Sequence, residues 1–334
     1  MNYIGSKFRL AGFIEHTIRS VAGNDLSQKI FCDLFAGTGI VGRIFKTAAK
    51  SVIANDVEYY SFVLNKNYIE NHVEIPDKQE TIDELNRLPL IDNGFIYKNY
   101  CMGGGSGRQY FSDDNGKKID TIRQHIESWK KTGRIADNSY YFLLASLLES
   151  ADKLANTASV YGAYLKHLKK SAQKKLVLEP ADFDVNENAH QVFNEDSNVL
   201  IKKIEGDILY LDPPYNARQY GANYHMLNTI AKYDDFMPNG KTGLRTYQKS
   251  DWCRRNKVEH VFDDLLKNAR FKYVFLSYNN EGLMPMEMIK NIMLRYGHYD
   301  LASTGYQRFK ADRDDNRNHK ASKTEEFVHV LEMR

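Results

Sequence analysis

A strand that is stopped abruptly by two prolines constrains this chain more than any other feature. The run "GDILYLD" (206–212) has the apolar character of a buried strand and is followed at once by "PPYNARQY". Proline removes a backbone donor and fixes φ, so Pro213 and Pro214 end the strand and hold a rigid turn. In open α/β sheets, ligands bind at the carboxyl ends of the strands. The turn therefore places Asp212 and Tyr215 where a ligand would lie, with little conformational freedom.

A second strand, close to the N-terminus, ends in a glycine-rich turn. "KIFCDLF" runs into "AGTG", "IVGRIFKTAAK" has helical character, and "SVIAND" is again strand-like. This order is similar to a dinucleotide-binding fingerprint, in which Gly37 and Gly39 would let the backbone approach a ligand. Asp56 ends the next strand, where an acid can accept hydrogen bonds from ribose hydroxyls. The alternative is that Asp56 caps the helix that follows.

The remaining patterns predict one α/β core that is interrupted by helices. "FRLAGFIEHTIRSVAG" has the spacing of an amphipathic opening helix. From residue 71 to 195 the alternation of strands and helices stops, and "SYYFLLASLLESADKLA" predicts a long helix. Strand patterns resume at 206–212 and continue in "KYVFLSYNN" and "EEFVHVLEMR". We therefore expect a core formed by residues 1–70 and 196–334, with a mainly helical insertion at 71–195.

Composition excludes several classes of protein. No apolar run approaches the roughly 20 residues of a membrane span, and no secretory signal pattern opens the chain, so we expect a soluble, cytoplasmic protein. Cys32, Cys101 and Cys253 are far apart and form no CxxC or Cys/His cluster. That spacing favours reduced thiols over a disulfide framework or a zinc site, and we expect no metal.

The net charge of +3 hides two basic regions. Residues 97–178 contain 14 Lys and Arg against 7 Asp and Glu, and residues 241–257 contain 6 against 1. Basic patches beside aromatic residues suit a polyanion, most simply nucleic acid. The alternative is that they are solvated helical faces.

The "DPPY" turn suits methylation of an exocyclic amino group, whose lone pair is delocalised into an aromatic ring. The Asp212 carboxylate and the Pro213 carbonyl would accept both amino hydrogens, and Tyr215 would stack on the base. This combines near-attack positioning with stabilisation of the developing cation. A base inside a duplex would first have to be flipped out. Alternatively, the tetrapeptide is only a turn after a strand, so the order of all the motifs is what favours the functional interpretation.

Taken together, the motifs resemble those of the adenine-specific DNA methyltransferases, in the group of DNA adenine methylases and restriction-system modification enzymes. The resemblance spans "YIGSK", "FCDLFAGTG", "ND" at 55–56, "NTASVYGAYLK", "NED" at 194–196, "LDPPYNARQY" and "FLSYNNEG". It implies a class I, Rossmann-like S-adenosylmethionine-dependent methyltransferase fold in which the insertion is a target-recognition domain. The implied reaction is methyl transfer from S-adenosylmethionine to the 6-amino group of adenine in a specific duplex sequence.

The resemblance also implies a role for individual residues. The cofactor would contact Tyr3 and Lys7 at its methionine end, Asp56 at its ribose, Asp196 at its adenine, and the loop residues Asp33, Phe35, Gly37 and Gly39. The catalytic group would be Asp212, Pro213, Pro214 and Tyr215, with Asp212 also close to the methionine amino group. The opening motif departs from many members in reading "IGSK", where Ser6 replaces a second glycine and leaves Lys7 in place.

Double-stranded DNA is the implied partner, and a restriction endonuclease acting on the same site would accompany a type II modification enzyme. Candidate DNA contacts are Arg108, Gln109, Arg245, Arg254 and Arg255, with loop stabilisation as the alternative for each. We expect a monomer, since one adenine is methylated per visit. Two other functions stay open at this point: methylation of RNA adenine or protein glutamine, and an inactive DNA-binding relative. Asp212 and the large insertion before it count against the first, and the intact motifs count against the second.

Overall fold

The computed structural model describes residues 7–307 and 323–334, except for the side chains of 305–307 and 323–325. The expected contact of Tyr3 with a cofactor therefore lies outside the described residues. The described chain divides into two compact units. A helical unit comprises Glu58–Glu187 and Tyr220–Gln248, and a sheet unit comprises Asn188–Gln219 with the described parts of Ser6–Val57 and Lys249–Arg334.

The sheet unit is built on one seven-stranded sheet in the order β3-β2-β1-β4-β5-β7-β6, within the described residues. Strands β1 to β5 run parallel, and β7 pairs antiparallel with both β5 and β6. The predicted α/β sheet, mainly parallel, is thereby confirmed. The strands are β1 (Ile30–Asp33), β2 (Ser51–Asn55), β3 (Gln191–Phe193), β4 (Gly206–Leu211), β5 (Phe271–Asn279), β6 (Gly297–Gln307) and β7 (Lys323–Met333).

The central strands are apolar because both of their faces are covered. In β4 every residue from Ile208 to Leu211 is buried, which is typical of a parallel strand between two helical layers. On one face Phe31 of β1 stacks on Phe45 of α2 with ring centroids 4.2 Å apart. On the other face Val258, Phe262 and Leu265 of α11 join the buried cluster of β4 and β5 residues, at the spacing of one helical stripe.

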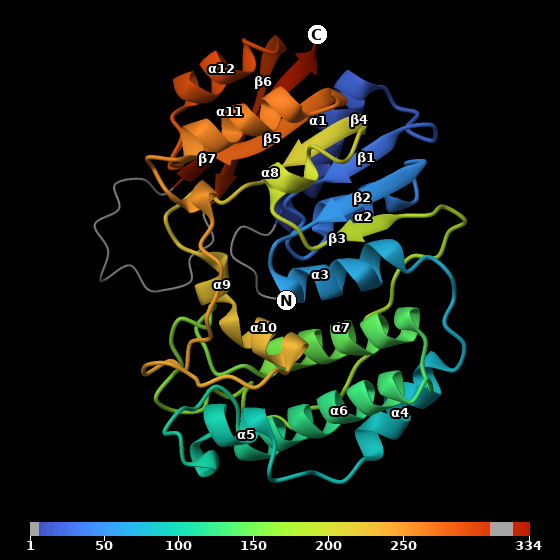
Figure 1. The fold of residues 1–334 in the computed structure, drawn as a ribbon, viewed down its shortest axis with the longest axis vertical. Helices are drawn as coiled ribbons and strands as arrows, with labels where there is room; N and C mark the ends of the chain where they lie inside the picture. Colours follow the sequence, from blue (N-terminus) through green and yellow to red (C-terminus); the bar gives the residue numbers. More distant parts are fainter. Residues whose placement is uncertain (1–6, 308–322) are drawn as a thin grey trace. The chain divides into compact units, whose positions relative to one another are not determined.

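Short helices complete the sheet unit, and Figure 1 shows α11 and α12 lying together near the red end of the chain. The opening helix predicted from its apolar spacing is present and ends at Gly23, whose φ of 97° suits glycine. The helices of this unit are η1 (Lys7–Leu10), α1 (Ala11–Ala22), α2 (Ile40–Lys46), α8 (Ser197–Leu200), η4 (Asp251–Cys253), α11 (Val258–Asn268) and α12 (Met286–Met293).

The helical unit is organised around the long helices α6 and α7, which lie side by side (Figure 1). The predicted helix in "SYYFLLASLLESADKLA" is α7, and its leucines lie in the unit's buried core. The chain enters this core twice, because α10 adds Met226, Leu227 and Ile230 to it. The unit contains α3 (Tyr59–Asn65), η2 (Lys66–Glu70), α4 (Lys78–Arg87), α5 (Phe95–Tyr100), η3 (Met102–Gly104), α6 (Asp113–Lys131), α7 (Asp137–Leu154), α9 (Tyr220–Asn223) and α10 (His225–Lys232).

Two strands were not predicted from the sequence. β3 has only three residues, and it falls inside the range expected for the insertion although it pairs with β2 of the sheet. β6 reads "GHYDLASTGYQ", which lacks a clear apolar alternation. A search of the described helices for one long and apolar enough to cross a bilayer finds none.

Candidate active site

The carboxyl ends of β1 and β2 are joined by the glycine loop that the sequence singles out. The Ala36 N–H donates to the carbonyl of Asn55 at the end of β2, at 2.9 Å. Gly37 and Gly39 have φ values of 53° and 77°, in the left-handed region that glycine enters without a steric cost. Gly39 is the N-cap of α2, so the loop passes directly into the helix.

Asp56 fixes the position of this loop. Its Oδ2 accepts a hydrogen bond from the Gly37 N–H at 2.8 Å. The alternative in which Asp56 caps the next helix is wrong, because the N-cap residue of α3 is Glu58. Asp56 thus lies against the glycine loop at the end of β2, which is the position expected for a residue that holds a ribose.

Asp33, the last residue of β1, is a buried acid of which only one side-chain oxygen accepts a hydrogen bond. It is 1% exposed, its Oδ2 accepts the Gly42 N–H at 3.2 Å, and its Oδ1 has no hydrogen-bond partner among the described residues. Burial, reinforced by the nearby Asp212 carboxylate, raises the pKa of Asp33 to about 8. A buried acid of this kind is suited to a cationic ligand, whose positive charge would favour its ionised form.

The "DPPY" segment ends β4 as the sequence predicts, with Leu211 as the last strand residue. Asp212 follows it at the carboxyl edge of the sheet, between the neighbouring strands β1 and β5. The turn is held at its far end, where the Tyr215 carbonyl accepts the Leu283 N–H at 3.0 Å. The Tyr215 ring is half-buried and packs against the apolar cluster beneath α11 and α12.

The Asp212 carboxylate belongs to a cluster of three charged side chains, in which Lys7 and Glu326 are buried and the Asp212 side chain is 19% exposed. The Lys7 Nζ lies 3.1 Å from Asp212 Oδ1 and 3.5 Å from Glu326 Oε2 on β7. Lys7 is 5% exposed and Glu326 8%. Burial raises the pKa of Asp212 to about 6, with Lys7 acting to lower it and Glu326 to raise it. For Lys7, burial lowers the pKa, but the two carboxylates outweigh it and the pKa stays well above its usual value.

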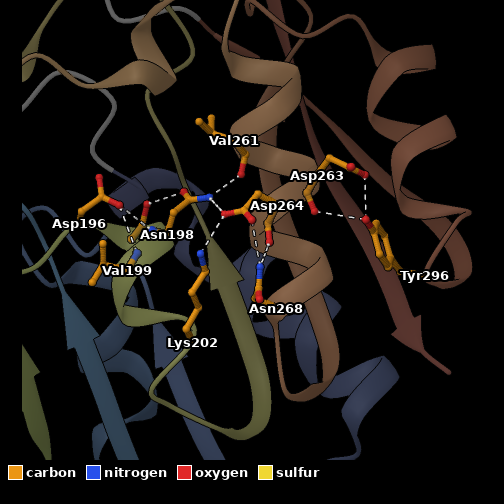
Figure 2. Close-up of polar contacts among 10 residues, drawn as sticks. Asp196, Asn198, Val199, Lys202, Val261, Asp263, Asp264, Asn268 and Tyr296 are labelled. Atoms are coloured by element: carbon orange, nitrogen blue, oxygen red, sulfur yellow. Dashed lines mark hydrogen bonds and ion pairs between the residues drawn. The ribbon is translucent and has the colours of Figure 1, made fainter.

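Asp196 is the N-cap residue of α8 in the sheet unit. Its side chain caps that helix, accepting the N–H of Asn198 at 2.9 Å and of Val199 at 3.3 Å. Figure 2 shows Asn198 joining α8 to α11 through the Val261 carbonyl and the Asp264 carboxylate. The carboxylate of Asp196 is exposed, so its capping role leaves an oxygen toward solvent.

Trp252 of η4 connects two of these segments, although no sequence motif pointed to it. Its indole packs edge-on against Phe35 of the glycine loop at 5.1 Å, and its Nε1–H donates to Ser197 Oγ of α8 at 3.1 Å. Trp252 is 3% exposed. The loop that carries Phe35 and the helix that carries Asp196 therefore share one rigid aromatic neighbour.

The candidate DNA-contacting residues have internal partners to different extents. In the helical unit, the Arg108 guanidinium donates to the carbonyls of Asn99, Gly240 and Lys241. Arg245 is 7% exposed and pairs with Asp234 at 2.8 Å. The Gln109 side chain is half-buried.

In the sheet unit, Arg254 lies 3.2 Å from Asp251, and Arg255 is exposed. Of the five nominated residues, Arg255 therefore has the most freely accessible side chain. Arg245 is the most deeply enclosed.

The model of the D12 class of N6 adenine-specific DNA methyltransferases matches residues 3–292 of the chain. The chain belongs to this family. It is 61% identical over 332 residues to the type II methyltransferase M.NlaIII of Neisseria lactamica, with 99% of each sequence covered. It is 40% identical to the type II methyltransferase M.CviAII of Paramecium bursaria Chlorella virus 1, with 93% of each covered.

A longer relative is also found, the type II methyltransferase M.FokI of Planomicrobium okeanokoites, which is 38% identical to this methyltransferase. The alignment covers 99% of the chain but 52% of that relative. The resemblance to adenine-specific DNA methyltransferases that the motifs indicated is confirmed, and these three relatives are type II methyltransferases.

Sequence reasoning about this methyltransferase missed Glu326. The residue lies in a segment that was predicted to be a strand, but an acid at a strand's start carries no signal by itself. Its proximity to Lys7 follows from the pairing of β7 with β5, which places Glu326 opposite Asn279. A contact between residues more than 300 positions apart can be found only once the sheet order is known.

Replacing Asp33 by asparagine should make the ligand-free methyltransferase more stable at alkaline pH. The pKa of Asp33 is about 8 in the folded state and near 3.8 in the unfolded chain, so its effect on stability becomes less favourable as pH rises from about 4 to about 8. Asparagine cannot ionise. We expect Asp33→Asn to raise the free energy of unfolding at pH 8.5 by several kcal/mol, because each tenfold difference between the folded and unfolded acid constants corresponds to about 1.4 kcal/mol.

Denaturant unfolding at pH 5 and pH 8.5 measures this difference. At pH 5 the carboxyl of the folded wild type is protonated and only a small part of the penalty has accumulated, so the difference between the two proteins should be much smaller there, and this comparison serves as the internal control. An advantage of the same size at both pH values would mean that packing, not ionisation, distinguishes the two side chains.

Proposed function

We propose that this chain is the modification enzyme of a type II restriction-modification system, which methylates the 6-amino group of adenine at one specific duplex sequence with S-adenosylmethionine. It would act in the cytoplasm as a monomer, alongside an endonuclease that cleaves the same site. The observation that carries the proposal is the Asp212 carboxylate at the end of β4, held by Lys7 in a turn made rigid by Pro213 and Pro214.

The residues at the carboxyl edge fit a cationic, ribose-containing cofactor. When bound, S-adenosylmethionine would supply an electrophilic methyl group from its sulfonium. Asp33, with its buried and unpartnered Oδ1, offers a negative charge to a cation. Asp56 would hold the ribose, Lys7 the methionine end, and Phe35, Gly37 and Gly39 would form the loop around the cofactor. Asp196 would accept a hydrogen bond from the cofactor adenine.

The catalytic turn acts on the adenine by orientation and by charge. Asp212 Oδ2 and the Pro213 carbonyl would accept the two hydrogens of the amino group, which turns its lone pair away from the ring. A carboxylate with a pKa of about 6 is a stronger acceptor than one at the usual value, and it also stabilises the positive charge that develops on nitrogen. Tyr215 would stack on the flipped base, which recovers part of the cost of unstacking it.

DNA recognition is proposed for the 71–195 region, with Arg108 and Gln109, which directly follow the glycine-rich run "GGGSG" (103–107) in a loop of the helical unit, and secondly for Arg245. The Arg108 guanidinium donates to two backbone carbonyls of the 239–244 turn, those of Gly240 and Lys241, and to the Asn99 carbonyl of α5. The Tyr100 hydroxyl also donates to the Gly243 carbonyl of that turn at 2.7 Å. Arg254 and Arg255 would contact phosphates, which supply salt-dependent affinity instead of sequence information.

Replacing Arg108 by alanine should relax or abolish site choice while leaving the affinity for S-adenosylmethionine intact. The variant loses three hydrogen bonds, two of which join the loop to the 239–244 turn and one of which joins it to α5. Methylation of oligonucleotides with one altered base pair, relative to the cognate site, measures the change. We expect the discrimination to fall by about tenfold or more, since one base pair contributes roughly 1–3 kcal/mol.

The matched control is Lys131→Ala, which removes an exposed cation from the same unit and should leave discrimination unchanged. Arg108→Lys keeps the positive charge, but a lysine ammonium lacks the planar, forked donors with which the guanidinium reaches three carbonyls. If Arg108→Ala methylated the cognate and altered sites in the wild-type ratio, a role of this loop in recognition would be excluded.

The proposed function is tested by expressing the protein in a host without adenine methylation and mapping modified adenines by single-molecule sequencing. Methylated adenine at one short motif, absent when Asp212→Ala is expressed, is the expected result. A folded protein that binds S-adenosylmethionine but leaves the host DNA unmodified would contradict the assignment of DNA as substrate and would direct the search to RNA or protein.

A further inference from the structure

Glu326 is a buried acid next to the proposed catalytic group. Its Oε2 lies 3.5 Å from the Lys7 Nζ and has no hydrogen-bond partner among the described residues. The backbone at this point is paired on both sides, with Asn279 of β5 and Thr304 of β6 as the opposite residues. The carboxylate is thus held at a fixed place, with the ammonium of Lys7 as its counterion.

The single positive charge of Lys7 lies near two carboxylates, so it cannot neutralise both of them. With all three groups ionised the cluster carries one net negative charge, in an environment where both Lys7 and Glu326 are less than a tenth exposed. Buried charges normally require pairing, and an unpaired one is costly. An arrangement with one excess carboxylate therefore calls for a functional reason.

We propose that Glu326 is a positioning residue for methyl transfer, which shares the Lys7 ammonium with Asp212 and so keeps the Asp212 carboxylate free to accept a hydrogen bond from the adenine amino group. This inference rests on the proposed function. Without Glu326, Lys7 would pair with Asp212 alone, and a carboxylate that is neutralised by a close ammonium is a weaker acceptor for another donor.

The charged and titratable groups around Asp212 determine the direction of the effect. They are Lys7 of η1, Asp33 of β1, Tyr210 of β4, Tyr215 of the turn and Glu326 of β7. Burial raises the pKa of Asp212 most, Lys7 lowers it, and Glu326 raises it. Removing the charge of Glu326 should therefore lower the pKa of Asp212 and draw its carboxylate toward Lys7.

Glu326→Gln tests the proposal because glutamine keeps the shape and removes the charge. Single-turnover methylation of duplex DNA is measured from about pH 5 to pH 9 with saturating S-adenosylmethionine, and cofactor affinity is measured by calorimetry. We expect the plateau rate to fall about tenfold. The acidic limb of the profile should move lower by at least about one pH unit, because two carboxylates that share one ammonium repel each other by more than that at an effective dielectric near 20. The cofactor dissociation constant should change by much less than the rate.

Two further variants complete the experiment. Glu332→Gln removes an exposed acid from the same strand and should leave the profile unchanged. Glu326→Asp keeps the charge but withdraws it by one methylene, so its acidic limb should lie between those of the wild type and Glu326→Gln. If Glu326→Gln does not fold, Glu326→Asp tests the proposal by the same measurement, the shift of the acidic limb of the pH–rate profile to lower pH.

The results that overturn the proposal are distinct from those that overturn the function. A wild-type protein without activity on DNA would contradict the proposed function and leave the role of Glu326 without a reaction to serve. An active wild type with an unmoved acidic limb in the Glu326 variants would contradict the positioning role alone. So would a loss of rate matched by an equal loss of cofactor affinity, since that pattern indicates a structural effect.

Discussion

Asp212→Ala is expected to lower the single-turnover rate of adenine methylation by about a hundredfold to a thousandfold, the scale of removing one transition-state hydrogen-bond partner from an active site. The change deletes the carboxylate proposed to accept an amino hydrogen and to stabilise the positive charge on nitrogen. It also leaves Lys7 with Glu326 as its one remaining acidic neighbour in the cluster. The rate is measured at saturating S-adenosylmethionine, so that weaker cofactor binding does not contribute.

A control for this experiment is available on the same strand. Asp207 lies at the opposite end of β4, where its Oδ2 accepts the Ile30 N–H at 2.7 Å. Asp207→Asn should retain most of the rate, because that end of the strand is away from the carboxyl edge. If Asp212→Ala kept more than about a tenth of the wild-type rate, its loss of barrier stabilisation would be under about 1.4 kcal/mol, too little for the proposed role.

Lys7→Met is expected to destabilise the protein by about 3–5 kcal/mol at neutral pH, the usual cost of removing one partner from a buried ion pair. The Asp212 and Glu326 carboxylates would then share a buried space without a cation between them. Methionine has a similar length to the lysine stem, so the loss should reflect the charge more than the packing.

The deficit of Lys7→Met should grow with pH. Lys7 lowers the pKa of Asp212, so its removal lifts that pKa further above 6. A carboxyl group whose pKa is higher in the folded than in the unfolded protein destabilises the fold increasingly as pH rises from the unfolded pKa to the folded pKa. Denaturant unfolding at pH 4.5 and pH 8 should thus show a small difference from wild type at the lower pH and a large one at the higher.

Lys50→Met, at an exposed site of the same unit, is the matched control. A constant deficit would mean that the lysine stem, and not its charge, stabilises the fold.

The sequence predicts the parts of this fold whose signals are local. The apolar runs that became β1, β4 and β5 are largely buried strands, and such runs stand out wherever they occur. The turn at Pro213 and Pro214 follows from proline geometry alone. Gly37 and Gly39 have the positive φ values that a glycine loop implies. These features depend on residues within about ten positions of one another, so one sequence is sufficient to find them.

Other features depend on partners that are distant in the chain. β6 is polar enough to resemble a loop, and it becomes a strand because β7 offers it a full register of hydrogen bonds. Arg245 looks like a surface cation in a basic segment, yet Asp234 and the ring of Phe236 enclose it. Neither outcome follows from composition or spacing. The basic segment around Arg245 therefore supplies fewer free cations than its sequence indicates.

The path of the chain after the catalytic turn limits how this enzyme can be rebuilt. Five residues beyond Tyr215, the chain enters the helical unit as Tyr220–Gln248 and contributes α10 to its core before returning. A graft of residues 71–195 from a relative with another target sequence would bring only part of that core and would pack against a foreign α10. Exchange of specificity by recombination should therefore require two coordinated segment exchanges, one on each side of the methyl-transfer motif, and single-segment chimeras should fail at the level of folding.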